Sequence, residues 1–233
     1  MDPFIIGTLS EWLGVFAVLM IAGVSTRFLR RPLVFVYPKR ELWVSLGIFA
    51  LGVVIALVMS GLTVTPLQMR LAAAGFTVLP VGIALLVRIQ PIRSAGWGRA
   101  TLKPSLFLGF ALAILVIFLR GKINLLLGGA SAEAGSVLLL LFFVIAAEET
   151  IFRGFIQLRL NGSLGERNAW LAAAALHLLW RLPILLVEPA AFPLSLLLEA
   201  GQSLLAGYAM QKTGSIIPST LYRLVSTWLM VIG

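Results

Sequence analysis

Apolar residues along the chain fall into eight runs, each separated from the next by a charged or Pro/Gly-rich break. About 20 apolar residues suffice for a helix to cross a bilayer, so this pattern predicts an all-α, polytopic transmembrane helical bundle of about eight spans. The expected spans lie near residues 5–26, 42–60, 71–89, 105–120, 136–158, 169–187, 193–210 and 214–232.

The composition supports this prediction. Sixty percent of the 233 residues are hydrophobic, 12% are charged and the mean hydropathy is +1.04, whereas about a quarter of the residues are charged in an average soluble protein. Eight spans occupy most of a chain of this length, so we expect one integral membrane domain. The chain contains no cysteine, which excludes a disulfide framework, a thiolate metal site and a cysteine nucleophile.

The net charge of +9 does not indicate nucleic-acid binding, because the basic residues are scattered between the apolar runs. Most basic residues of the connections follow the first, third, fifth and seventh runs, whereas the opposite side holds Arg70, Arg120, Lys122 and Arg181. Cytoplasmic loops keep an excess of Lys and Arg. We therefore expect both termini to lie outside the cytoplasm.

Three charged residues, Glu148, Glu149 and Arg153, follow directly on the apolar stretch 137–147. An unpaired charge near the middle of a bilayer costs about 2.5–3.5 kcal/mol, so a functional role is the first hypothesis. Glu149 and Arg153 are four residues apart, which places them on one helical face and predicts an ion pair. Glu148 points to another side and is expected to be free for chemistry.

The single histidine, His177, lies in the next apolar run, which a short loop connects to the Glu148 run. The two runs are expected to be antiparallel neighbours, so that Glu148 and His177 face one another. A carboxylate and an imidazole in a poorly hydrated cavity suit general acid–base hydrolysis. The structural alternative is a hydrogen-bonded core acid and a core histidine.

A metal site is harder to build from these residues. Catalytic zinc usually has three protein ligands rich in His, and this chain has one His and no Cys. We expect no cofactor to be required. The alternative is a divalent metal such as zinc, with Glu148 and His177 as ligands.

Three segments in this order resemble the CPBP family of intramembrane proteases. They are Glu-Glu-Thr-Ile-Phe-Arg-Gly at residues 148–154, the intramembrane His177, and Lys-Thr-Gly-Ser-Ile-Ile-Pro at residues 212–218. The family includes the type II CAAX prenyl endopeptidases and bacteriocin-processing or immunity-associated (Abi-like) proteins. The resemblance covers about residues 137–230. We therefore divide the chain into N-terminal transmembrane helices with little sequence signal (1–130) and CPBP-like catalytic core helices (131–233).

The resemblance implies that Glu148 activates the hydrolytic water, that Glu149 and Arg153 support the site, and that His177 is the histidine of the second motif. The chain departs from the family at three positions. Ala173 stands where the second motif usually has Phe, and Arg223 and Thr227 stand where the last helix normally has His and Asn.

Two arrangements of Arg223 would have opposite consequences. An ion pair with Glu148 would leave a carboxylate that activates water poorly, and activity would fall. A guanidinium that points at the scissile carbonyl would stabilise the oxyanion instead, with Thr227 as a second donor. The sequence leaves both arrangements open.

The function predicted by the resemblance is hydrolysis of membrane-associated substrates, such as CAAX-type C-termini or leader peptides, in a prokaryotic cell membrane. Its expected partners are membrane lipid and a membrane-associated peptide or protein. One rival is a catalytically inactive family member that binds a membrane peptide or partner. A second rival is a small transporter that uses Glu148, Glu199 and Arg223 as a polar relay, although no internal repeat is visible.

Overall fold

A computed structural model of the chain describes residues 3–23, 35–98 and 101–232, and within these ranges all regular structure is helical. The elements are α1 (Pro3–Ala22), α2 (Pro38–Ser60), α3 (Pro66–Val87), the 3-10 helix η2 (Ile92–Ala95), α4 (Leu102–Leu119), α5 (Asn124–Gly128), α6 (Ala132–Glu149), the π-helix η3 (Thr150–Gln157), α7 (Leu158–Leu164), α8 (Glu166–Leu185), α9 (Phe192–Thr213) and α10 (Ile217–Ile232). The predicted all-α bundle is confirmed.

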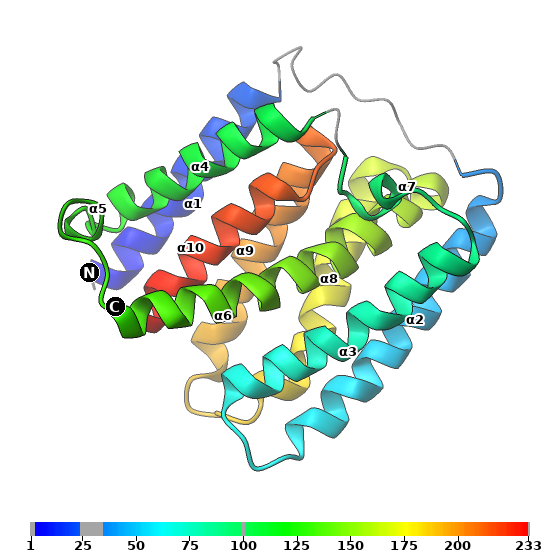
Figure 1. Ribbon diagram of the computed structural model, residues 1–233, viewed down its shortest axis with the longest axis horizontal. Coiled ribbons are helices and arrows are strands. Elements are labelled where there is room, and N and C mark those ends of the chain that lie inside the picture. The colour runs from blue at the N-terminus through cyan, green and yellow to red at the C-terminus, as the bar shows by residue number, and fades with distance from the viewer. Residues whose placement is uncertain (1–2, 24–34, 99–100, 233) are drawn as a thin grey trace.

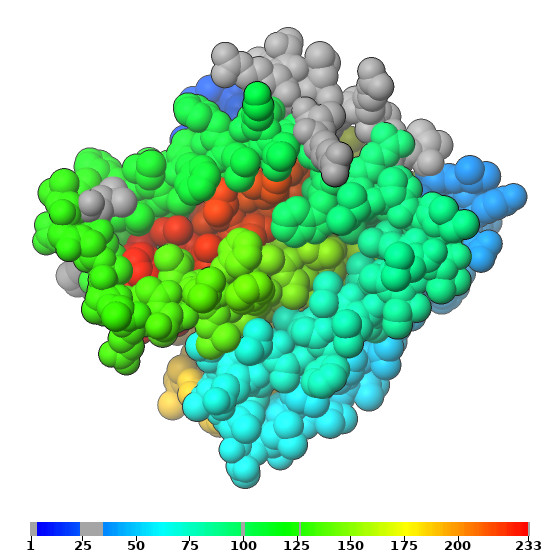
Figure 2. All heavy atoms as spheres, viewed as in Figure 1, coloured from blue at the N-terminus to red at the C-terminus, as the bar shows by residue number. Residues whose placement is uncertain are grey.

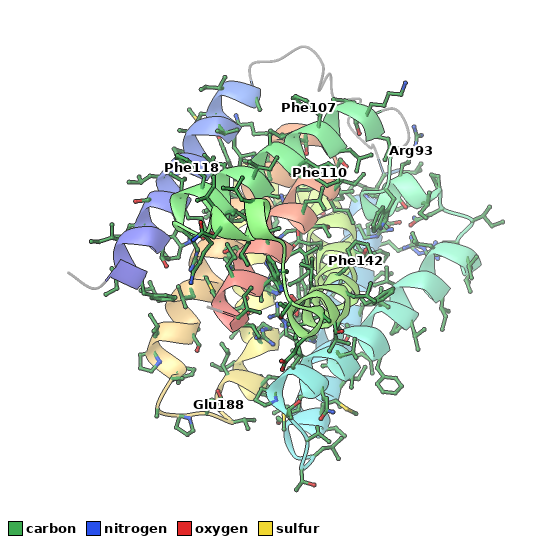
Figure 3. The ribbon with its side chains drawn as sticks, turned by 60° about the vertical axis from the view of Figure 1, so that its left-hand side comes forward. Arg93, Phe107, Phe110, Phe118, Phe142 and Glu188 are labelled. Atoms are coloured by element: carbon green, nitrogen blue, oxygen red, sulfur yellow. The ribbon has the colours of Figure 1, made fainter. Side chains whose placement is uncertain are left out.

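Six of these helical segments are long and apolar enough to cross a membrane: α1, α2, α3, α4, the continuous 33-residue rod α6–η3–α7, and α8. Large apolar side chains also point outward, as Phe107, Phe110 and Phe118 do on α4 (Figure 3). Such a surface fits lipid and not water. The chain is an integral membrane protein.

Two helix pairs flank the bundle, α1 with α4 on one side and α2 with α3 on the other (Figure 1). Between them lie α6, α8, α9 and α10, and α10 packs against α4, α6 and α9. In the space-filling view α10 is visible in a depression between α4 and α6 (Figure 2). The motif-bearing segments of residues 131–233 therefore occupy the centre of the molecule.

The buried apolar side chains form two clusters. One contains residues of α2, α3, η3 and α8, including Ile151, Phe152 and Trp180. The other contains residues of α1, α4, α9 and α10, together with Leu141 of α6. The rod α6–η3–α7 thus contributes to both clusters, and its buried Glu148 and Glu149 lie between Leu141 and Ile151.

Helix α3 begins at Pro66, five residues before the apolar run predicted from the sequence. Thr65 and Gln68 form a capping box, in which each side chain accepts a hydrogen bond from the backbone N–H of the other residue, and Pro66 occupies the first turn, where proline is favoured. The assignment of Arg70 to a loop was wrong, because this start places Arg70 inside the helix, where it is buried.

Gly154 of η3 allows the closest backbone contact in this part of the fold. A Cβ at this position would lie 1.9 Å from the carbonyl oxygen of Ala95, which belongs to η2. Gly96 has a positive φ of 84°, and its carbonyl accepts a hydrogen bond of 3.2 Å from the Ile216 N–H at the start of α10. Because Gly154 has no side chain, η2 can contact η3 directly. Gly96, which follows η2, then forms the hydrogen bond with Ile216 just before α10.

The Thr213-Gly214-Ser215 segment is the turn between α9 and α10. Gly214 ends α9 in the left-handed conformation, with φ 67°. The Thr213 hydroxyl accepts from the Ser215 N–H at 3.3 Å, and the Ser215 hydroxyl accepts from the Ile217 N–H at 3.3 Å. These bonds fix the direction in which α10 starts after the turn. They therefore determine the positions of Arg223 and Thr227 on that helix.

Candidate active site

Glu148 lies at the end of α6, fully buried, and both of its carboxylate oxygens are bound by arginine. Arg70 donates from Nε to Oε1 at 2.7 Å and from Nη2 to Oε2 at 2.8 Å. Nη2 of Arg223 lies 3.1 Å from Oε2. The expectation that Glu148 is unpaired was therefore wrong, because α3 and α10 each bring a guanidinium to this carboxylate.

His177 of α8 faces Glu148, as expected from the antiparallel arrangement. Its Nε2 lies 3.6 Å from Glu148 Oε2, too far for a good hydrogen bond, and Nε2 has no hydrogen-bond partner among the described residues. On the other side of the ring, Nδ1 is 3.2 Å from the Ser203 hydroxyl of α9. The ring is thereby oriented with Nε2 towards the carboxylate.

An aromatic neighbour covers the His177 ring although Ala173 replaces the family's phenylalanine. Phe152 of η3 meets the imidazole edge-on, with 4.8 Å between the ring centroids. The Trp180 ring centroid lies 5.4 Å from that of Phe152 and 6.2 Å from that of His177. The Ala173 carbonyl accepts a hydrogen bond of 3.3 Å from Arg153 Nη1.

Glu149 and Arg153 are both fully buried, but their contact is loose. Arg153 Nε lies 3.9 Å from Glu149 Oε1, whereas Arg223 Nη1 donates to the same oxygen at 2.8 Å. The π-helix η3 begins directly after Glu149. The physical reason for the loose contact is competition from another helix, because Arg223 of α10 binds the Glu149 oxygen at hydrogen-bond distance. Arg153 instead donates to the Ser203 hydroxyl at 2.7 Å.

Arg223 adopts the first of the two arrangements considered above, since it binds carboxylates. Besides its contacts with Glu148 and Glu149, its Nη2 donates to Glu199 Oε2 at 3.1 Å. Arg223 is fully buried in α10 and therefore joins three acidic residues from α6 and α9. It is the central cation of the cluster.

Glu199 and Arg181 complete the cluster. Arg181 Nη2 donates to Glu199 Oε1 at 3.0 Å, and Arg70 Nη1 lies 3.6 Å from the same oxygen. The assignment of Arg181 to a connection was wrong, because α8 continues through Pro183 to Leu185 and buries it. From the sequence, Glu199 was expected to have a role only in the rival transporter, as part of its polar relay.

The sequence did contain a signal for Arg70. The Thr65-Pro-Leu-Gln68 string is a helix start with a capping box and an early proline, and it would have placed Arg70 in the second turn of α3. No comparable local signal pairs Arg70 with Glu148, since the two residues are 78 positions apart.

Thr227 lies one turn after Arg223 on α10, and its hydroxyl is 3.4 Å from Gln202 Oε1. It lines a cavity of about 360 Å³ that reaches the charged cluster. Arg70 and Arg181 line the same cavity, together with apolar residues of α6, α8 and α10. The cavity thus gives access to the arginines that bind Glu148 and Glu199.

Two further buried ion pairs lie apart from this cluster. Arg120 donates to Glu11, whose other oxygen accepts from Tyr222 at 3.0 Å and from Ser226 at 2.6 Å. Near the opposite end of the bundle, Arg159 Nε donates to Glu41 Oε2 at 3.0 Å. The Arg159–Glu41 pair connects α2 to α7, and the hydrogen bonds from Tyr222 and Ser226 to Glu11 connect α1 to α10.

No group of three or more His, Cys, Asp or Glu side chains is placed to bind a metal ion, as far as the described residues go. Glu148 and His177 are the two ligands considered from the sequence. The neighbours of Glu148 are the guanidinium groups of Arg70 and Arg223, and a divalent cation would have to share the carboxylate with them.

Comparison with known proteins identifies the C-terminal part of the chain. Residues 130–229 match the family described as "Type II CAAX prenyl endopeptidase Rce1-like", and this range contains Glu148, His177 and Arg223. No curated protein and no solved structure matches the chain. This match confirms the resemblance to CPBP proteases: residues 130–229 are similar to the Rce1-like family of type II CAAX prenyl endopeptidases, a family of proteases.

Proposed function

We propose that the chain is an intramembrane endopeptidase that hydrolyses peptide bonds of membrane-associated substrates, with Glu148 and His177 acting on the nucleophilic water. The observation that supports this best is the approach of His177 Nε2 to Glu148 Oε2, at 3.6 Å, within a fully buried site. A water molecule that bridges these two atoms from the side donates one hydrogen bond to each of them. The cavity beside Arg70 and Thr227 provides the approach for a peptide.

The proposed reaction is a general-base hydrolysis. The water oxygen attacks the scissile carbonyl carbon while its proton passes to Glu148, and His177 holds the water in line. When the carbon–nitrogen bond breaks, the proton on Glu148 passes to the leaving amine. The products are a carboxylate and an amine, and Glu148 returns to its ionised form.

The arginines explain how this site would differ between its resting and substrate-bound forms. Arg70 lies on the cavity wall and donates from Nε and Nη2 to Glu148. A substrate carbonyl in the cavity competes for these donors, which would free a Glu148 lone pair and stabilise the developing oxyanion at once. Arg223 stays with Glu149 and Glu199. The proposed mechanism uses protein side chains and requires no metal.

A second candidate function is supported by a specific observation. Both oxygens of Glu148 are bound by arginine, and a carboxylate in a bidentate pair is a poor base. In this case the chain would be an inactive family member that binds a membrane peptide without cutting it. The two candidates share the cavity and differ in the chemistry.

The experiment compares purified wild type with Glu148→Gln and His177→Asn in lipid vesicles. Two probes are offered: a farnesylated peptide with a CAAX-type C-terminus, and a membrane-anchored leader peptide. We expect mass spectrometry to detect cleavage of one probe by the wild type, and a loss of at least about 100-fold in both variants, as removal of a general base predicts. Glu133→Gln is the matched control, because Glu133 lies exposed on the same helix.

Equal cleavage by wild type and Glu148→Gln would overturn the protease assignment. Binding of a probe without cleavage by the wild type would favour the second candidate. In that case the double variant Arg223→His, Thr227→Asn, which restores the residues usual in the family, is expected to gain cleavage.

A further inference from the structure

A cavity of about 500 Å³ lies where α2 begins and α3 ends, outside the charged cluster around Glu148. Its lining comes from residues 35–37, from the first turn of α2 and from residues 87–94. Both helices are long and apolar enough to cross a membrane, so their adjoining ends lie at the surface of the bilayer (Figure 1). The cavity therefore opens at the depth of the lipid headgroups.

The lining of this cavity carries more positive than negative charge. Among the described residues it includes three arginines, Arg40, Arg88 and Arg93, and one carboxylate, Glu41. Arg88 Nη1 donates to Glu41 Oε2 at 2.9 Å, and Arg159 Nε donates to the same oxygen at 3.0 Å. Arg88 Nη2 binds the other oxygen. Two guanidinium groups thus share one carboxylate, which leaves no negative charge for the other two arginines.

Arg40 and Arg93 are the arginines with free donors. Their side chains are exposed on the cavity lining and form no ion pair or hydrogen bond with any residue that the structure describes. A guanidinium presents its donors in a planar fork that matches the oxygens of a phosphate group. These two side chains can therefore bind an anion while Arg88 stays with Glu41.

Buried hydrogen bonds hold the inner side of the cavity in place. Arg159 of α7 is fully buried, and its Nη1 donates to the Ser94 carbonyl at 3.0 Å. Gln90 Nε2 donates to Glu41 Oε1 at 3.1 Å. These bonds fix the connection after α3 against α2 and α7. Arg93, which directly precedes Ser94, is thereby kept at the cavity.

The surroundings of the cavity are apolar and exposed. Val36 and Val87 belong to its lining, and Leu86 and Ile89 lie beside Val87 in the chain. Tyr37 is exposed as well, as is typical of aromatic residues at a membrane–water interface. A soluble phosphate gains nothing from such a surface, whereas the acyl chains of a lipid cover it. The combination of arginines and exposed apolar side chains indicates a phospholipid.

We propose that Arg40 and Arg93 bind the phosphate group of an anionic phospholipid in the cavity at the ends of α2 and α3. The site goes beyond the proposed function and does not involve Glu148. The orientation expected from the basic residues places this end of the bundle on the cytoplasmic side, where anionic lipids create a negative surface potential. A zwitterionic lipid binds more weakly, because its cationic headgroup would lie next to the arginines.

The test measures lipid binding to the purified full-length protein in a neutral detergent by native mass spectrometry. The two probes have the same dioleoyl chains and differ in the headgroup: phosphatidylglycerol is anionic and phosphatidylcholine is zwitterionic. We expect the first phosphatidylglycerol molecule to bind at least about 10-fold more tightly than phosphatidylcholine, as two arginine contacts predict.

A pair of double variants locates the site. Arg40→Gln, Arg93→Gln is expected to reduce the preference for phosphatidylglycerol to less than about 3-fold, because both free guanidinium groups are lost. Lys103→Gln, Arg167→Gln is the matched control, since it removes two positive charges from exposed positions outside this cavity. The control should keep the wild-type preference. Thermal unfolding verifies that both variants are folded, which their exposed positions lead us to expect.

Equal binding of the two lipids by the wild type would overturn the proposal without any variant. A preference that survives in the Arg40→Gln, Arg93→Gln protein would overturn it as well, and so would an equal loss in the control, which would indicate an effect of net charge alone. Glycerol phosphate, the soluble headgroup without acyl chains, is added as a competitor. Displacement of phosphatidylglycerol by an equal concentration of glycerol phosphate would show that the ligand is a soluble phosphate and not a lipid.

Discussion

Arg70 and Glu148 are 78 residues apart in the sequence and form a two-point ion pair, with Nε–Oε1 at 2.7 Å and Nη2–Oε2 at 2.8 Å. Parallel bonds of this kind restrict orientation as well as distance. The pair joins α3 of the N-terminal helices to α6 of the Rce1-like core. It therefore links the part of the chain without a family match to the predicted catalytic carboxylate.

Arg70→Gln is expected to destabilise the protein by about 3–5 kcal/mol, because removal of one partner leaves a buried charge without full compensation. The measurement is equilibrium unfolding in detergent micelles. The double variant Arg70→Gln, Glu148→Gln should be more stable than the sum of the single effects predicts, since neither charge is then left alone. Strict additivity of the two substitutions would contradict the ion pair.

Arg223→Gln should be at least as damaging, with a loss of about 3–5 kcal/mol, because three carboxylates converge on this guanidinium. Arg223→Lys is expected to lose stability too. A single ammonium group cannot reproduce the planar fork that reaches Glu148, Glu149 and Glu199 together. The unfolding midpoint and the yield of monodisperse protein after size-exclusion chromatography report both effects. A Lys variant with wild-type stability would contradict this role.

Gly154→Ala is predicted to displace η2, because the added Cβ would lie 1.9 Å from the Ala95 carbonyl oxygen. Overpacking of this kind costs about 1–3 kcal/mol or more. Gly135→Ala is the matched control, since Gly135 lies on α6 with open space around its Cβ position. There the same substitution should be neutral or stabilise by up to about 1 kcal/mol. Similar unfolding midpoints for both variants would show that η2 does not depend on this contact.

The orientation predicted from the basic residues can be tested directly, because the chain has no native cysteine. Leu62→Cys lies in the connection between α2 and α3, and Ser163→Cys lies near the end of α7; both positions are exposed. An impermeant maleimide should label Leu62→Cys in intact cells and Ser163→Cys only after permeabilisation. The opposite pattern would place both termini in the cytoplasm.

The approach of Glu148 to His177 was predictable from the sequence, since two adjacent spans joined by a short loop pack side by side. The order of the motifs also indicated the family. The strength of the Glu149–Arg153 contact was not predictable, because the partners that compete for these two residues come from other helices. Arg223 of α10 binds Glu149, and Ser203 of α9 accepts from Arg153.

The sequence by itself determined that this is an integral membrane protein of helical spans with buried charges in its core, because hydropathy and charge are properties of the chain alone. Only the tertiary structure decided which charges meet. Arg70, Arg181 and Glu199 come from three different helices, and electrostatic pairing depends on distance in space rather than on separation along the chain. The packing of α3 and α10 against α6 therefore decided that Glu148 is bound by arginine, and the packing of α8 against α9 decided that Arg181 pairs with Glu199.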